Sequence, residues 1–484
     1  MIEFNFTLDM FIAILPEIGL LVLAAIVLIM DVILPRERRR VMGWIVAGGL
    51  FGIIIVSIFA GRPGMEAQLL WGGMVRFDWL AFIFKMIFLF GAAVTALFAM
   101  DVDNLGNRGE FYLLLLVATM GMGLMAAAGD LILLYLAIET TSIPLYVLAG
   151  FMTKEKKSTE SGFKYLFFGA LTSAIMLYGF SLLYGFAGTT SIYDLAAIVQ
   201  QGDVGLVPLF GVLLLVLVGF GFKISAVPFH FWAPDVYEGA PTPVTGFLST
   251  ASKAAGFAVL MRVLLVVFPE SLPSWTSVVA ILSVASMTLG NSLALAQRNM
   301  KRLLAYSSIA HAGYALIGVV AFSPLGMAAV VYYLGAYLLT NLAAFGVVVA
   351  FWRVTGSDEI ADYAGLSRRA PGLSLALMVA FLSLAGMPPL GGFIGKVLVF
   401  AAAVDADLIW LALVGIINSI VGLYYYLTVL KVVYLFRSED EEKPLPISRS
   451  YTVALVILTL GIVLTGTLIA PFFAWGTTAA AALF

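Results

Sequence analysis

The sequence is dominated by continuous runs of apolar residues, each about twenty residues long and separated by short polar segments. A run of this length matches an α-helix that crosses the hydrocarbon core of a bilayer. Because backbone amides cannot stay unpaired in hydrocarbon, only helices or a closed β-barrel span it, and a barrel would show alternating segments of about ten residues. The unbroken runs therefore predict an all-α, polytopic membrane protein.

Fourteen such runs can be counted, joined by loops too short for a soluble domain. The composition agrees, since 62% of the residues are hydrophobic and 11% are charged, whereas a soluble domain has about a quarter charged residues. The predicted spans are 11–34, 41–60, 77–100, 111–128, 131–152, 162–187, 206–230, 243–268, 275–296, 302–321, 326–352, 371–402, 408–436 and 451–475.

Basic residues concentrate in alternate loops. The clear loop positions after even-numbered spans hold only Arg62 and Arg76. Because Lys and Arg accumulate in cytoplasmic loops, we expect the odd loops in the cytoplasm and both termini on the outer, periplasmic side of a bacterial inner membrane. Among the basic residues of the odd loops are Arg36, Arg38, Arg39, Arg40, Lys154, Lys156, Lys157, Arg298, Lys301, Arg302, Arg353, Arg368, Arg369, Arg437, Lys443 and Arg449.

Four charged residues stand out within apolar runs, namely Glu139, Lys223, Lys253 and Lys396. A charge at a span centre costs about 3 kcal/mol on insertion scales, so such residues usually face a wet or protein-lined interior. Each alone could equally be a structural ion pair or a lysine whose stem reaches the interface. Lys85 and Lys431 fit that structural reading better, because they lie nearer span ends. The four together favour a transport function.

Glycine and proline flank two of these lysines, in GFGFKISAVP around Lys223 and GMPPLGGFIGK around Lys396. Both residue types weaken a helix inside an apolar run, so we expect broken helices seven and twelve, as in transporters built from internal repeats. The spacing from Lys223 to Lys396 (396 − 223 = 173) nearly equals that from Glu139 to His311 (311 − 139 = 172). We therefore predict two five-helix repeats, inverted because five is odd.

The predicted repeats divide the chain into four parts. Residues 1–110 hold three N-terminal spans, 111–268 the first repeat, 275–436 the second, and 437–484 a loop and the last span. Helices four to eight would then correspond to helices nine to thirteen.

The repeat gives His311 a place parallel to that of Glu139. A histidine can gain or lose a proton near neutral pH, although a neutral histidine hydrogen-bonded between packed helices is at least as common. A nearby Glu139 would hold Lys223 charged, and separating the two would ease release of the proton. We predict a relay in which Lys223 passes a proton through Lys253, His311 and water to Lys396.

The residue inventory excludes several other chemistries. The chain has no cysteine, which removes disulfides, Cys-ligated zinc and iron–sulfur clusters. Its two histidines, His230 and His311, make bis-histidine haem ligation a poor reading. No GxxxxGK[ST] loop is present, and MGMGLMAAAG lies within a span and not after a strand. We expect no cofactor or metal in this chain, and no nucleic-acid partner.

Three segments resemble the subunit N family of proton-pumping NADH-quinone oxidoreductase, respiratory complex I. They are PFHFWAPDVYEGAPTPVTGFLSTASKAAGFAVLMR (228–262), KRLLAYSSIAHAGYALIG (301–318) and GMPPLGGFIGK (386–396). The resemblance spans about residues 10–475. The family has a glutamate in helix five and lysines in broken helix seven, helix eight and broken helix twelve. Glu139, Lys223, Lys253 and Lys396 match this pattern, and His230 and His311 fall where the family often has histidines.

The resemblance implies one of three antiporter-like subunits of the membrane arm, which move protons while quinone is reduced elsewhere in the complex. The chain would then be a subunit of a translocase without redox chemistry of its own. NADH or another donor, flavin, iron–sulfur clusters and the quinone site would belong to partner subunits. Its neighbours would be other membrane-arm subunits, antiporter-like ones among them, and the lipid bilayer.

Three other functions stay open. A subunit of a multi-component sodium/proton antiporter would share the fold and the lysines, although DVYEGAPTPV favours subunit N. A stand-alone carrier of small solutes would bind its substrate without partners. A structural scaffold would use the buried charges only to hold helices together, so single substitutions would harm assembly and spare pumping.

Overall fold

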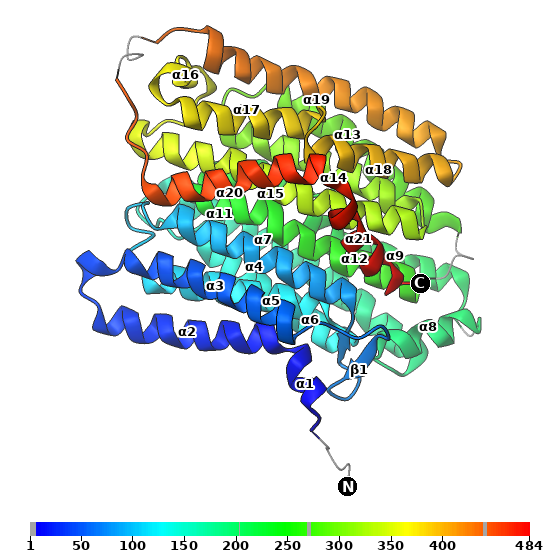
Figure 1. Ribbon diagram of the computed structural model, residues 1–484. Helices are drawn as coiled ribbons and strands as arrows, with labels where there is room; N and C mark the ends of the chain where they lie inside the picture. The colour runs from blue at the N-terminus through cyan, green and yellow to red at the C-terminus, as the bar shows by residue number, and fades with distance from the viewer. Residues whose placement is uncertain (1–5, 203, 269–272, 439–442) are drawn as a thin grey trace.

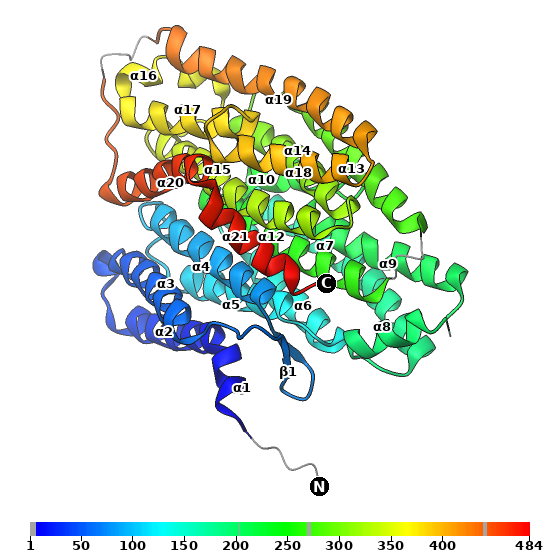
Figure 2. The same ribbon diagram turned by 45° about the vertical axis from the view of Figure 1, so that its right-hand side comes forward.

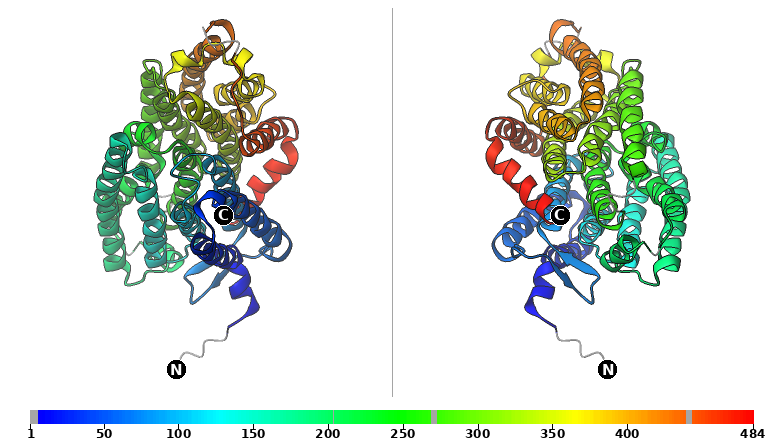
Figure 3. Two further views of the ribbon diagram at one scale, coloured as in Figure 1. Left: turned by 90° about the vertical axis from the view of Figure 1, so that its left-hand side faces the viewer. Right: turned by 90° about the vertical axis from the view of Figure 1, so that its right-hand side faces the viewer.

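The computed structural model describes residues 6–202, 204–268, 273–438 and 443–484. Most helices lie roughly along one axis, horizontal in Figure 1 and seen end-on in Figure 3. Within these described ranges, thirteen helices are long and apolar enough to cross a membrane. The chain is thus a multi-pass, almost entirely helical membrane protein.

The N-terminal part combines helices with a short hairpin that the sequence did not predict. Its elements are α1 (Leu8–Ala13), α2 (Leu15–Ile33), η1 (Arg36–Arg38), α3 (Val41–Ala60), β1 (Gln68–Leu70), β2 (Val75–Phe77) and α4 (Trp79–Ala99). The strands pair antiparallel with Leu69 opposite Arg76. The turn between them places Gly72 and Gly73 at positive φ, which residues without a Cβ adopt readily.

The central part contains two helices much shorter than a span, α10 and α11, directly after α9. Its elements are α5 (Gly109–Ala126), α6 (Leu131–Ala149), α7 (Lys156–Ala187), α8 (Ile192–Gln200), α9 (Leu206–Ile224), α10 (Trp232–Gly239), α11 (Thr242–Phe247), η2 (Leu248–Ser252) and α12 (Lys253–Val267). The predicted span 243–268 corresponds to α11, η2 and α12 in succession, with η2 in π-helical geometry.

The C-terminal part begins with α13 and ends with a helix that the sequence did not predict, α21. Its elements are α13 (Pro273–Ala294), α14 (Met300–Val320), α15 (Pro324–Thr355), η3 (Ile360–Tyr363), α16 (Leu366–Arg369), α17 (Pro371–Ala385), α18 (Gly391–Asp405), α19 (Ile409–Leu435), α20 (Arg449–Thr467) and α21 (Ile469–Ala481). α21 contacts α15 and α4 and lies at an angle to the neighbouring helices (Figure 2).

Thirteen of the fourteen predicted runs overlap a helix that is long and apolar enough to cross a membrane within the described residues, and the run 371–402 is the exception. The run 371–402 forms two helices of 15 residues each, α17 and α18, separated at 386–390. Each is about 22 Å long, which is shorter than the hydrocarbon core. The predicted run 206–230 also ends early, because α9 stops at Ile224.

The two interruptions share local features. A residue in the left-handed region follows each first helix, Ser225 after α9 and Gly386 after α17. The first helices end 161 residues apart (385 − 224). Lys223 lies before its interruption and Lys396 after its own, so the lysine spacing of 173 does not measure the spacing of the interruptions.

α6 and α14 begin in the same way. Asp130 caps α6 and Asn299 caps α14, each accepting two backbone N–H bonds, an arrangement that stabilises a helix start by about 1 kcal/mol. The first helical N–H of each also donates to a distant carbonyl, that of Thr190 at 2.8 Å and that of Asp358 at 2.7 Å. The two caps are 169 residues apart (299 − 130).

α7 and α15 match in length and in their ends. Each has 32 residues and is closed by a glycine in the left-handed conformation, Gly188 or Gly356. These glycines lie 168 residues apart (356 − 188). The helices therefore recur three to five residues sooner than the charged side chains suggested.

The two ends of the bundle differ in their connections. The α2–α3 connection, α16 and the start of α20, which carry many of the basic residues, lie at the left of Figure 1, whereas β1 and the C-terminus lie toward the other end. α14, α15, α12 and α4 are mostly buried inside the bundle, whereas only a third of α2 and of α3 is buried and both expose apolar side chains. Such an apolar outer surface suits contact with lipid.

Candidate functional site

Glu139 lies in the middle of α6 and remains partly exposed. The hydroxyl of Ser173, on α7, donates a hydrogen bond to its carboxylate. No ion pair joins Glu139 and Lys223, although both are among the described residues. The direct contact on which the predicted switch depends is therefore absent in this conformation.

Lys223 occupies the last turn of α9 and contacts α6 through a serine. Its Nζ donates to the Oγ of Ser142 at 3.0 Å, and that Oγ donates in turn to the carbonyl of Ile138 at 2.6 Å. Ser142 is three residues from Glu139, and side chains at this spacing are neighbours on a helix surface. Lys223 thus reaches α6 one turn beyond the glutamate and is held by a neutral group.

Lys253 stands at the junction of η2 and α12 with 2% of its surface exposed. Its Nζ donates to the backbone carbonyl of Ser308 on α14 at 3.0 Å and lies 5.9 Å from the ring centre of Tyr237. One turn on, Gly256 abuts the stem of Lys223, since a Cβ there would lie 3.1 Å from the lysine Cγ. The two lysines therefore belong to one buried cluster.

His311, on α14, is enclosed by tyrosines. Its Nδ1 lies 2.6 Å from the hydroxyl of Tyr333, and its Nε2 lies 3.2 Å from that of Tyr426. Tyr337 stacks on the ring with centroids 5.0 Å apart. A neutral imidazole has one donor and one acceptor nitrogen, so both tautomers can be satisfied here by turning the two hydroxyls.

Lys396, near the start of α18, reaches back across the interruption. Its Nζ donates to the carbonyl of Ala385, the last residue of α17, at 3.1 Å, where the negative end of the helix dipole favours a cation. It also lies 4.7 Å from the ring centre of Tyr314, within the range of a cation–π contact. Tyr314 contacts the His311 ring as well, with centroids 5.6 Å apart.

Together these contacts form a continuous buried path. Lys223 abuts the helix that carries Lys253, and Lys253 binds the carbonyl of Ser308. Ser308 lies one helical turn before His311. The ring of Tyr314 contacts both His311 and Lys396. In the described part of this region, four buried side-chain hydroxyls make no well-formed hydrogen bond, namely those of Ser225, Tyr237, Ser308 and Tyr337. They lie close to one another, Tyr237 beside Ser225 and Ser308, and Tyr337 beside Ser308. Leaving such a group unpaired costs about 1–3 kcal/mol, so this is where internal water is expected.

His230 lies in the interruption between α9 and α10. Its ring packs on Phe231 with centroids 4.5 Å apart, and its Nδ1 is buried without a hydrogen-bond partner among the described residues. Its ring makes no hydrogen bond to Lys223, Lys253, His311 or Lys396, all of which are described.

Sequence reasoning missed the neutral partners of the charged residues. Ser142 was within reach of prediction, since it lies one helical turn from Glu139. Ser173, Tyr333 and Tyr426 come from three other helices, α7, α15 and α19, and no local pattern marks them.

Comparisons with known proteins place this chain in a family. A family model described as "NADH:quinone oxidoreductase/Mrp antiporter, TM" matches residues 128–422. NADH-quinone oxidoreductase subunit N of Moorella thermoacetica is 45% identical over 435 residues, 90% of this chain and 90% of that protein. The chain belongs to the subunit N family of NADH-quinone oxidoreductase. The protein of the same name from Heliobacterium modesticaldum is 42% identical over 93% of this chain and 94% of its own length.

Solved structures give the same fold for this subunit N family member. A chain of respiratory complex I from Thermus thermophilus, with bound aureothin, has a TM-score of 0.79 at 34% identity and covers 95% of this chain and 98% of its own. A chain of the Mrp complex from Dietzia sp. DQ12-45-1b has a TM-score of 0.84 at 21% identity and covers 99% and 98%. At 21% identity, the similarity to the Mrp complex chain shows a shared fold and no more.

Two other buried charges of this subunit N family member hold helices together. Lys85 pairs with Glu17 at 2.9 Å and joins α4 to α2, so it is a structural ion pair and does not extend to the interface. Arg262, which the sequence reading did not single out, pairs with Asp78 at 2.7 Å. Lys431 is exposed, as expected of a lysine that reaches the interface.

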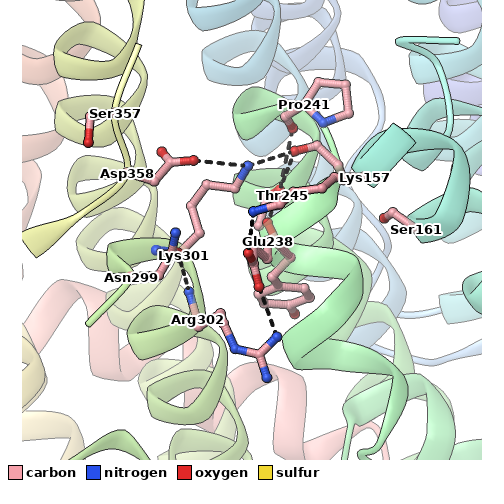
Figure 4. A network of polar contacts seen from close by, with 12 residues as sticks. Lys157, Ser161, Glu238, Pro241, Thr245, Asn299, Lys301, Arg302, Ser357 and Asp358 are labelled. Carbon is pink, nitrogen blue, oxygen red and sulfur yellow. Dashed lines mark hydrogen bonds and ion pairs between the residues drawn. The ribbon is translucent and has the colours of Figure 1, made fainter. Parts of the chain in front are cut away.

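An ion-pair network covers the basic-loop end, where Figure 4 shows Arg302 directed at Glu238. Arg302 also binds Asp235 at 2.8 Å, and Lys164 binds Asp235 at 2.6 Å. Partial burial alone would raise the pKa of Asp235, but the hydrogen bonds from Lys164 and Arg302 outweigh it and hold that pKa below its usual value. The pKa of Glu238 is lowered in the same way by Lys157 and Arg302.

In the part of the chain that the structure describes, no three His, Cys, Asp or Glu residues lie close enough together to hold a metal ion.

Proposed function

We propose that this chain is a proton-translocating membrane-arm subunit of complex I, and that Glu139, Lys223, Lys253, His311 and Lys396 carry the protons. The observation that carries the proposal is the buried path from α9 through α12 and α14 to α18. Three of its members are lysines bound by serine or backbone oxygens. An ammonium group without a carboxylate partner is costly in a protein interior, which favours loss of a proton from one of them.

Proton movement along this path needs groups that both donate and accept. The tyrosines around His311 and the buried hydroxyls of Ser225, Tyr237, Ser308 and Tyr337 supply such groups beside the lysines. Waters bound to these hydroxyls would connect Lys253 with His311. A proton leaving the Lys223 ammonium would pass to water and on to Lys253 or His311, leaving a neutral amine behind.

Glu139 and Ser142 would control the first lysine. In the described conformation Ser142 holds Lys223 and Ser173 holds Glu139. If both serine contacts break, the carboxylate and the ammonium can pair, which stabilises the charged lysine. If they reform, Lys223 is held by a neutral oxygen and gives up its proton more easily. His230 would take part only after a movement of the α9–α10 interruption.

We further propose that the chain contains two inverted five-helix units within 111–268 and 275–436, flanked by 1–110 and 437–484. The matching caps of α6 and α14 support this, as do the matching glycine ends of α7 and α15. α9 with α10, and α17 with α18, would then be broken helices seven and twelve, giving fourteen crossings. With an offset of 169, the residue that corresponds to His311 is Ser142 (142 + 169 = 311) and no longer Glu139.

Family membership and the placement of basic residues support a proposal for the setting of the chain. The basic-loop end would face the cytoplasm and both termini the periplasm of a bacterial inner membrane. NADH or another electron donor, flavin, iron–sulfur clusters and quinone would be bound by partner subunits, and other antiporter-like subunits would be neighbours. Moving one charge against about 150 mV costs roughly 3.5 kcal/mol, and quinone reduction in those partners would supply it.

The second candidate is a subunit of a multi-component sodium/proton antiporter, which the fold of the Mrp complex chain supports. Sequence identity favours the complex I subunit, since the subunit N of Moorella thermoacetica is 45% identical to this chain and the Mrp complex chain 21%. Gentle purification of the tagged chain from its native membrane discriminates them. Redox subunits should come with it if it serves complex I, and none if it serves an antiporter.

The relay is tested in inverted membrane vesicles that contain the whole complex. Lys223→Ala and Lys396→Ala should each lower the number of protons pumped per electron delivered to quinone. Lys431→Ala is the matched control, since that lysine is exposed at a helix end, and it should pump normally. If both variants assemble and pump as well as the control, the relay is wrong.

A further inference from the structure

A cavity of about 330 Å³ opens at the basic-loop end, between α7, α10, α14 and the loop that follows α15. Its charged lining consists of four carboxylates and two ammonium groups, from Glu155, Lys157, Glu238, Lys301, Asp358 and Glu359. A cleft lined mainly by one sign of charge raises the local concentration of the opposite ion. This cavity therefore favours cations, and its volume accommodates several water molecules.

Asp358 and Lys301 form the inner part of this lining, and Figure 4 shows their side chains directed at each other. Lys301 is 95% buried. Its Nζ lies 3.8 Å from Oδ2 of Asp358 and donates to the carbonyl of Ala240 at 3.0 Å. Oδ1 of Asp358 is buried and has no hydrogen-bond partner in the described residues. The carboxylate thus has one oxygen facing Lys301 and one buried oxygen that still needs a hydrogen-bond donor.

The cavity also reaches toward the relay. Lys301 and Ser308 lie on the same side of α14, seven residues or about 10 Å apart, and Ser308 binds Lys253. Ala240, at the cavity wall, begins the segment that leads through α11 and η2 to Lys253. Tyr237, three residues before Ala240, points its ring toward the same lysine.

We propose that this cavity takes up protons from the basic-loop side, with Asp358 as the proton acceptor and Lys301 as its positioning residue. The inference rests on the proposed proton translocation and names its uptake site. A hydronium ion gives its proton to the Asp358 carboxylate, leaving water and a neutral carboxylic acid. The acid then gives that proton to a water on the inner side and becomes a carboxylate again, while Lys301 stays charged.

The surroundings of Asp358 suit this exchange. Burial raises the pKa of Asp358 above its usual value, against the opposite effect of Lys301 and Lys157, and Glu238 raises it further. Glu155 and Glu359 complete the charged groups of the cavity. A carboxylate whose pKa is moved toward the working pH accepts and releases protons more evenly.

The first test compares Asp358→Asn with Asp362→Asn in inverted vesicles containing the whole complex. Asp362 is an exposed carboxylate four residues away that binds Ser357 and does not line the cavity. If uptake depends on Asp358, its variant should pump at least about tenfold more slowly when protons are scarce, near pH 8.5, and close to normally near pH 6. The Asp362 variant should match the parent at both pH values.

A second test does not depend on the acidic side chain being replaceable. Because the chain has no cysteine, Ser357→Cys places one thiol at the cavity wall, and Thr159→Cys places one at an exposed site outside it. An anionic, membrane-impermeant methanethiosulfonate added to inverted vesicles should label both. It should slow pumping only in the Ser357 variant, and the reagent should label neither in right-side-out vesicles.

The outcomes separate this inference from the proposed function. If Lys223→Ala and Lys396→Ala abolish pumping while Asp358→Asn and labelled Ser357→Cys pump normally at pH 8.5, protons enter elsewhere and the inference is overturned alone. If the lysine variants also pump normally, the proposed function itself fails. Lys301→Arg should keep most of the pumping rate, because arginine still carries a positive charge that positions the Asp358 carboxylate. Lys301→Gln should lose pumping near pH 8.5, as Asp358→Asn does.

Discussion

Lys223 and Lys396 are the same residue type at the two interruptions of the bundle, yet they are held differently. Lys223 ends the helix before its interruption and binds the hydroxyl of Ser142 from another helix. Lys396 follows its interruption and binds the carbonyl of Ala385, at the end of the preceding helix. A serine hydroxyl can rotate away or donate elsewhere, whereas a backbone carbonyl is fixed. The first lysine is therefore the adjustable one and the second the constant one.

Replacing either lysine by arginine tests what the two share, and it should have the largest effect. Arginine keeps the positive charge but does not deprotonate in proteins. We expect Lys223→Arg and Lys396→Arg to assemble and to reduce proton pumping by about a hundredfold or more, as loss of a proton-transfer group commonly does. Pumping per electron in inverted vesicles is the measurement. Normal pumping by either variant would mean that its lysine acts only as a charge.

Ser142→Ala tests the difference between them. Removing one hydrogen bond to a charged group costs about 1.5–3 kcal/mol, so pumping should fall by about tenfold or more through loss of control over Lys223. Ser142→Thr, which keeps the hydroxyl, should recover most of it. Thr141→Val is the matched control, since Thr141 is an equally buried neighbour that bonds to its own helix and to Met125. An equal loss in the control would remove the special role of Ser142.

Tyr314 sharpens the comparison on the side of Lys396. Tyr314→Phe keeps the aromatic face beneath the ammonium, whereas Tyr314→Leu removes it and with it about 1–2 kcal/mol of cation–π attraction. We expect the leucine variant to pump protons several-fold more slowly than the phenylalanine variant. Both variants lack the hydroxyl, so the difference between them reports the ring face alone. Equal rates would show that the ring face contributes nothing to holding Lys396.

A variant of the surface ion-pair network should have the smallest effect, and it gives a baseline for the variants of Lys223 and Lys396. The folded-state pKa of Glu238 lies below its usual 4.5 and that of Asp235 below its usual 3.8. Their contribution to stability is therefore present when the pH is above those usual pKa values. It is lost as the pH falls through the folded-state pKa of each group. Glu238→Gln should lower the melting temperature of the purified complex slightly at pH 7, and the difference from the parent should shrink toward pH 4. A constant difference would contradict the ion-pair explanation.

The apolar runs predicted most of the helices, because twenty residues of continuous hydrophobicity have few alternatives in a bilayer. The mid-run charges were equally visible, because each stands out against that background. Their spacing exceeded the recurrence of the helices by three to five residues. Lys223 and Lys396 lie on opposite sides of their interruptions, so their separation measures side-chain placement and not the recurrence of helices.

Contacts between distant helices could not be predicted from one sequence. Arg262 and Asp78 are 184 residues apart, and nothing in either segment specifies the pairing. The tyrosine surroundings of His311 come from α15 and α19, whose tyrosines look like ordinary lipid-facing or core residues. The α17–α18 interruption was signalled by proline and glycine, but a signal of that kind does not say how many residues leave the helix.

Gly256 and Gly386 each touch the aliphatic stem of one of these lysines, the first beside Cγ of Lys223 and the second beside Cδ of Lys396. A lysine stem has four rotatable bonds, and the distance its nitrogen can travel depends on what stands next to the inner bonds. With hydrogen atoms alone on the neighbouring Cα, both stems keep room to swing. The reach of each ammonium is therefore set by a residue that carries no chemistry of its own.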